Sequence, residues 1–176
     1  MGAEGGEGKG GSWGGLRGRR LVETARWGQC AYESALRERV GHIVGATAKN
    51  ADVSRALDTV WSADGRETLF LKSRVVMAAR AAGKLPIGGL WQQVHDLVGL
   101  RQSAQRDRAL GMSGELVLHP SNVPAINEIY SPSPEQVAYY EGMIAALERA
   151  QKEGRASTIY EGEHIDIAHV KTAHEI

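Results

Sequence analysis

The chain has 176 residues, which is room for one domain with one hydrophobic core, and its 42% apolar and 24% charged residues are typical of a globular protein. The 21 basic and 21 acidic residues balance, which argues against a nucleic-acid surface, and no apolar run approaches the roughly 20 residues that span a bilayer. The single cysteine, Cys30, excludes an internal disulfide and fits a reducing compartment, so we expect a cytoplasmic protein.

The first 39 residues carry little regular pattern. Nine glycines and three arginines fall within residues 1–20, and such a segment buries too little apolar area to offset its ordering entropy, so we expect disorder. It has no apolar stretch of a secretory signal, and Glu4 and Glu7 argue against a transit peptide. Residues 21–39 are compatible with a weakly patterned helix, and we expect regular structure to begin near Val40.

From Val40 onward, strand and helix patterns alternate. Three short apolar runs are typical of buried strands, at residues 40–46, 85–91 and 115–118. Residues 52–57, 67–82 and 96–110 favour helices, with glycine stop signals after the last two and Asp96 as a cap. This alternation predicts parallel βαβ units, and about three such units are too few to close a barrel of eight strands.

The clearest local signal is a long helix that begins after Ser133. That serine is followed by Pro134 and, three residues on, by Gln136, which together are typical of a capped helix start. The apolar stripe of this helix ends at Gly154, and it consists of Val137, Tyr140, Ile144 and Leu147. The sequence therefore predicts a helix that packs one face on the rest of the fold.

Five motifs in fixed order then give a family resemblance. They are Ser73 to Gly83, His95 to Leu100, Gly111-Met112-Ser113-Gly114 running into Leu118-His119-Pro120-Ser121, Asn127 to Glu135, and Tyr160 to Asp166. With them, the chain from about Val40 to Ile176 resembles the citrate lyase β-subunit and malyl-CoA (citramalyl-CoA) lyase family. The resemblance covers only the C-terminal portion of such a protein.

The resemblance implies an α/β fold, namely the C-terminal part of a TIM (β/α)8 barrel with a helical lid. We therefore expect an irregular segment at residues 1–39, the last β/α units of an incomplete barrel at residues 40–130, and a C-terminal helix and lid at residues 131–176. The N-terminal half of the barrel is expected to be missing from this sequence.

The implied activity is Mg²⁺-dependent carbon–carbon cleavage or formation of a 3-hydroxyacyl-CoA such as citryl-, malyl- or citramalyl-CoA, giving a keto acid and acetyl-CoA. Asp166 matches the lid aspartate that transfers a proton, and His119, Pro120 and Asn122 match a position that lines the substrate or CoA site. The Mg²⁺ ligands of the family have no counterpart that we assign in this chain. The resemblance also implies a homo-oligomer, of trimer type, in which the lid covers a neighbouring subunit.

Plainer interpretations stand beside these. From spacing alone Asp166 is placed to cap a terminal helix, and His119-Pro120 is equally compatible with a turn whose imidazole bonds the backbone. His164, His169 and His174 lie five apart, unlike the i, i+4 pair of a helical zinc site, so a solvated face is favoured. The alternative to an enzyme is a catalytically silent partial barrel that acts, if at all, by associating with a partner subunit.

Overall fold

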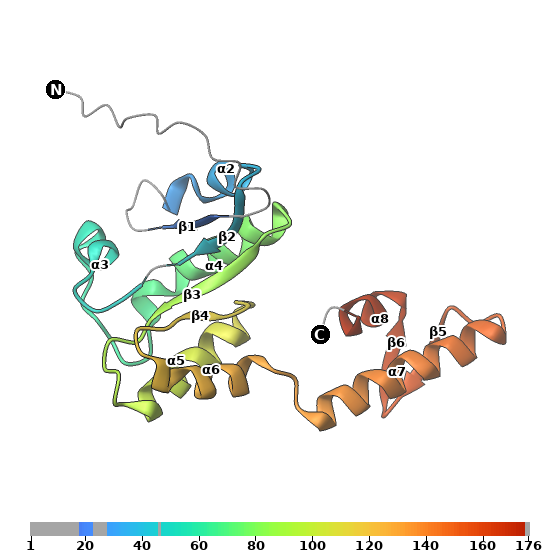
Figure 1. The fold of residues 1–176 in the computed structure, drawn as a ribbon. Helices are drawn as coiled ribbons and strands as arrows, with labels where there is room; N and C mark the ends of the chain where they lie inside the picture. The colour runs from blue at the N-terminus through green and yellow to red at the C-terminus, as the bar shows by residue number, and fades with distance from the viewer. Residues whose placement is uncertain (1–17, 23–27, 46, 175–176) are drawn as a thin grey trace, which may run out of the picture. The chain divides into compact units, whose positions relative to one another are not determined.

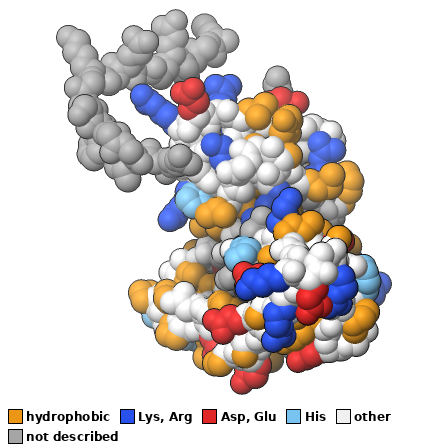
Figure 2. Space-filling view, turned by 90° about the vertical axis from the view of Figure 1, so that its right-hand side faces the viewer, with side chains coloured by type: hydrophobic (Ala, Val, Ile, Leu, Met, Phe, Trp, Pro, Cys, Tyr) orange, Lys and Arg blue, Asp and Glu red, His pale blue; other side chains and the backbone are white. Residues whose placement is uncertain are grey.

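The computed structural model describes residues 18–22, 28–45 and 47–174. These fall into two compact units, Met1–Glu128 and Ile129–Ile176, and each unit is described by itself. Within the described residues, no helix is both long enough and apolar enough to cross a membrane. On the face shown in Figure 2, acidic and basic side chains lie interspersed, as the balanced formal charge leads one to expect.

The first unit is built on a parallel sheet of four strands (Figure 1). The strands are β1 (Gly18–Leu21), β2 (Val40–Val44), β3 (Leu85–Leu90) and β4 (Glu115–Leu116), and they pair in chain order. In a barrel each strand pairs with the next strand along the chain, always on the same side. In a doubly wound sheet the strand order reverses at one point. The α/β class with parallel strands is therefore confirmed.

Helices separate successive strands. They are α2 (Ala31–Ala35), α3 (Asp52–Leu57), α4 (Arg66–Ala81) and α5 (Leu97–Ala109), and the 3-10 turn η1 (Pro120–Asn122) and α6 (Val123–Tyr130) follow the last strand, β4. The α4 helix packs on β2 and β3, and a Cβ added at Gly45 would meet Val75 of α4. The fully buried side chains Ile43 and Val75 place the hydrophobic core between this helix and the sheet.

Regular structure begins earlier than the sequence led us to expect. The prediction that it starts near Val40 is wrong, because β1 pairs with β2 from Gly18 onward and α2 lies before β2. The β1 segment, Gly-Arg-Arg-Leu, has no apolar alternation, so its strand conformation comes from pairing with a neighbour and not from local propensity. The disorder expected of residues 1–20 falls, for residues 1–17, outside the described residues.

The second unit packs a hairpin and a short helix against a long helix. Its elements are α7 (Pro134–Lys152), β5 (Ser157–Tyr160), β6 (Glu163–Asp166) and α8 (Ile167–Ala173). The α7 start is a complete capping box between Ser133 and Gln136, as predicted. The hairpin turn at Glu161-Gly162 has φ angles of 46° and 86°, which is the left-handed geometry of a two-residue turn.

A small core holds the second unit together. Met143 and Leu147 of α7 pack with Ile165 of β6 and Val170 of α8, and Ile165 is fully buried. These four residues come from three elements, so the hairpin and α8 are fixed against α7. Asp166, at the junction of β6 and α8, thereby has a defined backbone position within its own unit.

Candidate functional site

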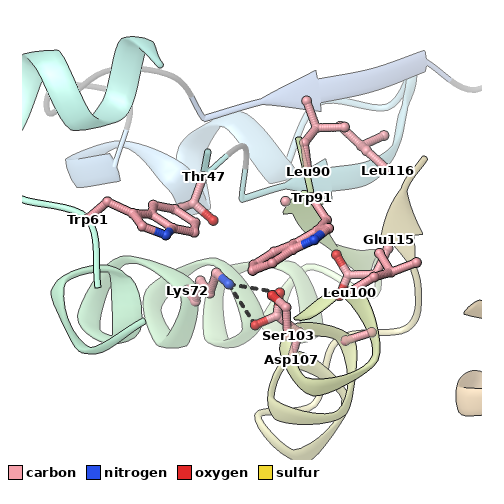
Figure 3. A pocket seen from close by; sticks show the side chains of 12 residues that line it. Thr47, Trp61, Lys72, Leu90, Trp91, Leu100, Ser103, Asp107, Glu115 and Leu116 are labelled. Carbon is pink, nitrogen blue, oxygen red and sulfur yellow. Dashed lines mark hydrogen bonds and ion pairs between the residues drawn. The ribbon is translucent and has the colours of Figure 1, made fainter. Parts of the chain in front are cut away.

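A buried ion pair joins α4 to α5 in the first unit. Lys72 Nζ donates to both carboxylate oxygens of Asp107, at 2.7 and 2.9 Å (Figure 3). The two side chains are only 10% and 3% exposed. A buried charge is tolerated only with a partner, so neither group can serve a ligand without leaving the other uncompensated. We interpret the pair as structural.

Two tryptophans line a groove beside this pair. Trp61 precedes α4 and Trp91 follows β3; their ring centroids are 6.4 Å apart and the ring planes are inclined by 53°. A Cβ at Gly99 would lie 2.2 Å from the Trp91 ring, so the glycine is what lets the indole lie on the first turn of α5. The groove has a volume of about 450 Å³, and its other polar lining residues are Lys49, Gln92, Gln93, Asp96, Gln102 and Arg106.

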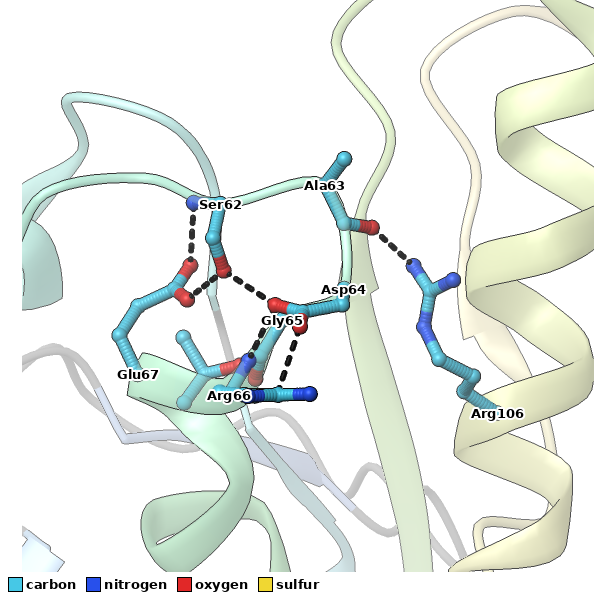
Figure 4. Close-up of polar contacts among 8 residues, drawn as sticks. Ser62, Ala63, Asp64, Gly65, Arg66, Glu67 and Arg106 are labelled. Carbon is cyan, nitrogen blue, oxygen red and sulfur yellow. Dashed lines mark hydrogen bonds and ion pairs between the residues drawn. The ribbon is translucent and has the colours of Figure 1, made fainter.

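A hydrogen-bonded turn fixes the segment that carries Trp61 (Figure 4). The Ser62 hydroxyl lies against the carboxylates of Asp64 and Glu67, and because it has one hydrogen it donates to one of them at a time. That contact lowers the pKa of Asp64; for Glu67, burial raises the pKa but the hydrogen bonds from Ser62 outweigh it. Arg106 Nη2 donates to the Ala63 carbonyl at 2.9 Å and so ties the turn to α5.

His119, Pro120 and Asn122 lie just beyond the carboxyl end of β4 and belong to the first unit. The Ser121 backbone N–H donates to His119 Nδ1 at 3.3 Å, so in the neutral ring the hydrogen lies on Nε2, for which the described residues provide no hydrogen-bond acceptor. Pro120 is the first residue of η1. Asn122 is only 1% exposed, and its Oδ1 accepts from the Ser121 hydroxyl at 3.4 Å.

This geometry contains the turn that the sequence offered as the alternative for His119, yet it leaves the Nε2 edge of the ring open. Asn122 as placed does not reach the surface. Asn122 contacts Ser121, and Ser121 in turn contacts His119, since Ser121 Oγ lies 2.8 Å from His119 Nδ1. The structure thus presents His119 as the exposed member of a short polar chain.

Asp166, in the second unit, caps α8 as its spacing predicted. The Ala168 backbone N–H donates to Asp166 Oδ1 at 2.9 Å, and the Asp166 backbone N–H donates to His169 Nδ1 at 3.2 Å. His169 Nδ1 also lies 2.9 Å from Asp166 Oδ1. The nitrogen must accept in one of these contacts and donate in the other, so the ring makes only one of them at a time.

The Asp166 carboxyl remains accessible in spite of the cap, since 44% of its side chain is exposed. Its pKa is lowered, first by the contact with the His169 side chain and then by the Ala168 backbone N–H. The lowered pKa favours the ionised carboxylate, which is the form that accepts a proton, and at the same time makes that carboxylate a weaker base. The cap and an acid–base role are therefore compatible at this residue.

A magnesium site is not formed by the residues described. Among them no group of three or more His, Cys, Asp or Glu side chains lies close enough together to hold a metal. Asp96 is engaged as the cap of α5, accepting from the Gly99 backbone N–H at 2.9 Å, and Asp52 pairs with Arg55 at 2.6 Å. Asp52 is the first residue of α3, and Ala51 is the N-cap of that helix.

Two features of this region were not found from the sequence. Trp61 and Trp91 are 30 residues apart, and Lys72 and Asp107 are 35 apart, so no local spacing connects either pair. The only signal was that Trp91 is the last residue of the strand predicted at residues 85–91, near the carboxyl end where parallel sheets place functional groups.

Curated relatives match parts of the chain. An L-malyl-CoA/β-methylmalyl-CoA lyase of Cereibacter sphaeroides is 36% identical over 107 residues, which is 61% of this chain and 34% of the relative. A (3S)-malyl-CoA thioesterase of the same species is 27% identical over 155 residues, which is 88% of this chain and 53% of the relative. The chain thus spans about half or less of the length of these proteins.

Solved structures match the fold. A CitE protein of Mycobacterium tuberculosis, in complex with magnesium, acetoacetate and coenzyme A, is similar with a TM-score of 0.73 and 27% identity, covering 88% of this chain and 57% of that one. A citrate lyase of Burkholderia xenovorans gives a TM-score of 0.75 at 21% identity, covering 89% and 50%, and supports the fold alone.

The decisive comparison is with the family as a whole. The HpcH/HpaI aldolase/citrate lyase family matches residues 21–120, which includes all of the segment from β2 through β4. This match covers more than half of the chain and agrees with both curated relatives and with the similar structures. The chain belongs to the HpcH/HpaI aldolase/citrate lyase family.

Proposed function

We propose that residues 18–130 form consecutive β/α units of a (β/α)8 barrel and that residues 131–176 form its helical lid. The sequential parallel order of β1 to β4 supports this, because a barrel requires that order. The proposal extends the units predicted for residues 40–130 by one strand, β1, at their N-terminal side.

We propose further that this barrel is a carbon–carbon lyase of 3-hydroxyacyl-CoA thioesters. In cleavage, the hydroxyl proton is lost to a base, the hydroxyl carbon becomes the carbonyl of a keto acid, and the bonding pair moves to the α-carbon of the thioester. One proton is then added at that carbon, which gives acetyl-CoA and leaves no net change in protons. The family match over residues 21–120 is the observation that carries this proposal.

Asp166 is the proposed proton carrier at the α-carbon. In the bond-forming direction its carboxylate removes the proton, and in the cleavage direction the protonated acid returns it. The exposure of the carboxyl supports both roles, because the group is accessible to a substrate. Asp166→Asn keeps the shape and the cap but cannot accept the proton.

His119 is proposed to contact the substrate or its CoA portion through its open Nε2–H. Pro120 and Asn122 support it by shaping the turn after β4 and by contacting Ser121. Magnesium in this family would stabilise negative charge on the carbonyl oxygen. Because the described residues do not form a site for it, no step here is assigned through the metal.

Product analysis tests the proposal. The full chain is incubated with Mg²⁺ and with malyl-, citramalyl- or citryl-CoA, and the products are separated by chromatography. We expect a keto acid with acetyl-CoA from at least one ester, and loss of that product in Asp166→Asn. Turnover of none of the three esters contradicts the proposal, and full activity in Asp166→Asn contradicts the role of that residue.

Thioester hydrolysis is a second candidate, supported by the (3S)-malyl-CoA thioesterase, whose match extends over 88% of this chain. The same chromatogram separates the two, because hydrolysis releases free CoA and the intact hydroxy acid. Binding to a partner subunit without catalysis is a third candidate. It is supported by Leu21 and Leu85, which lie on the sheet face away from α4 and are 39% and 45% exposed.

A further inference from the structure

His169 lies beside the proposed proton carrier, Asp166, and completes the capping box of α8 with it. Its Nδ1 is 2.9 Å from Asp166 Oδ1 and 3.2 Å from the Asp166 backbone nitrogen. Among the described residues, no other ion pair involves the Asp166 carboxylate. Glu163, at the start of β6, contacts the Tyr139 hydroxyl of α7 instead. Within the described part of the chain, the imidazole is therefore the ionisable group in position to exchange a proton with this carboxyl.

Both contacts use the same nitrogen, and each requires a different protonation state of the ring. A neutral ring with a lone pair on Nδ1 accepts from the Asp166 backbone N–H, as the capping box requires. A charged ring, which is protonated on both nitrogens, instead donates its Nδ1–H to Asp166 Oδ1. Once that proton has passed to Oδ1, the lone pair left on Nδ1 already faces the backbone N–H. The ring thus has a partner before and after the transfer.

The rest of the ring is open to solvent. The His169 side chain is 46% exposed, and no described residue hydrogen-bonds to its Nε2. Imidazole is the side chain that takes up and releases protons most readily near neutral pH. Water or buffer can therefore return a proton to Nδ1 after the ring has given one up.

We propose that His169 returns the catalytic proton to Asp166 after each cleavage, an inference that rests on the proposed lyase function. In cleavage the protonated Asp166 carboxyl gives its proton to the α-carbon of the thioester and becomes a carboxylate. The charged imidazole then transfers a proton from Nδ1 to Asp166 Oδ1, and water or buffer recharges the ring. His169 touches no substrate atom in this scheme, so it acts through Asp166 as a positioning residue.

The protons balance over the cycle. The hydroxyl proton of the substrate leaves through its own base to solvent, and one proton enters from solvent through His169 and Asp166 to the α-carbon. A half-turn of the carboxyl about its Cβ–Cγ bond presents the new proton to the next substrate, because the two carboxyl oxygens are chemically equivalent. The half-turn also restores the cap, since the other oxygen then faces the Ala168 backbone N–H.

Two substitutions separate the proton relay from the cap. His169→Gln keeps the capping box, because a glutamine oxygen at this position also accepts from the N-cap backbone N–H, but it cannot carry a proton. His169→Ala removes both functions. The matched control is His174→Gln, which removes an exposed imidazole from the other end of the same helix.

The assay is cleavage, at low buffer concentration, of the acyl-CoA ester that the full chain turns over, with and without added imidazole. We expect His169→Gln to lower kcat about tenfold, which is less than general acid catalysis as a whole contributes, because the exposed carboxyl also exchanges with water directly. Added imidazole should restore most of the lost rate in His169→Gln and His169→Ala and should change wild type little. His174→Gln should behave as wild type.

A cap without a relay predicts different results. Full activity of His169→Gln overturns the proposal, and so does a loss of rate that added imidazole leaves unrestored. Either result leaves the lyase function standing, because that function is tested on wild type and Asp166→Asn. Turnover of no ester by wild type overturns both proposals.

Nitrogen-15 NMR of the full chain tests the ring itself and needs no turnover. We expect the neutral His169 ring to carry its hydrogen on Nε2, because Nδ1 accepts from the Asp166 backbone N–H. A neutral ring with its hydrogen on Nδ1 overturns the proposal, since Nδ1 would then have no lone pair for the backbone after the transfer.

Discussion

Replacing Lys72 by methionine should severely destabilise the first unit. The substitution leaves the Asp107 carboxylate, which is 3% exposed, without its cation, and no other described side chain takes that place. Removing one partner of a buried ion pair costs about 3–5 kcal/mol, because the remaining charge stays desolvated. Whole proteins are stable by about 5–15 kcal/mol, so this is a large fraction of the total.

The assay is equilibrium unfolding in urea, followed by far-ultraviolet circular dichroism. The double variant Lys72→Met/Asp107→Leu buries no charge and should recover most of the lost free energy of unfolding. Arg101→Met is the control, since it removes a cation from the exposed Arg101–Glu128 pair and should change stability little. A single variant as stable as wild type, or a double variant no more stable than the single one, would refute this reasoning.

Three further predictions concern local structure. Ser133→Ala removes the serine half of the α7 capping box and should lower the free energy of unfolding by about 1 kcal/mol in the same urea assay. Gly89→Ala should cost about 1–3 kcal/mol, because the new methyl group meets a backbone carbonyl oxygen at 2.3 Å. Gly114→Ala, whose nearest neighbour would lie 3.7 Å away, is its control and should be near neutral. His169→Ala should raise the Asp166 pKa toward its ordinary value, which carbon-13 resonances of the carboxyl measure, and an unchanged pKa would remove His169 as the cause.

The change in the Asp166 pKa also predicts how the stability of His169→Ala depends on pH. The folded Asp166 carboxyl has a pKa below its ordinary value, so its contribution to stability is present above the unfolded pKa and is lost as pH falls through the folded one. Without His169 the two pKa values lie closer together. The variant should therefore lose less stability between neutral and acidic pH than wild type does.

Elements with local signals were predictable from the sequence. The α7 start follows from Ser133 and Gln136, and β3 follows from an apolar run of strand length; both are present. The β1 strand and the β5–β6 hairpin were missed for different reasons. β1 acquires its conformation by pairing with β2, so its own sequence carries no strand pattern. The turn at Glu161-Gly162 did carry a local signal, because a glycine there lies between two short segments that mix polar and apolar residues, which is typical of a hairpin turn.

The candidate site residues also differ in whether a local sequence signal identifies them. Asp166 and His119 were predicted as site residues because each belongs to a contiguous motif, and the structure adds the hydrogen-bond partner of each, His169 and Ser121. The groove between Trp61 and Trp91 was not found, since it depends on contacts between residues far apart in the chain and on Gly99 leaving room for an indole. Spacing can identify a capped helix, but it cannot identify side chains that meet only through tertiary packing.

The most direct test of the central claim is hydrogen exchange at the thioester. The full chain is mixed with acetyl-CoA, Mg²⁺ and a keto acid analogue in D₂O, and deuterium at the acetyl carbon is measured by mass spectrometry. The account predicts that wild type incorporates deuterium and that Asp166→Asn does not. Absence of incorporation by wild type, or equal incorporation by the variant, would contradict it.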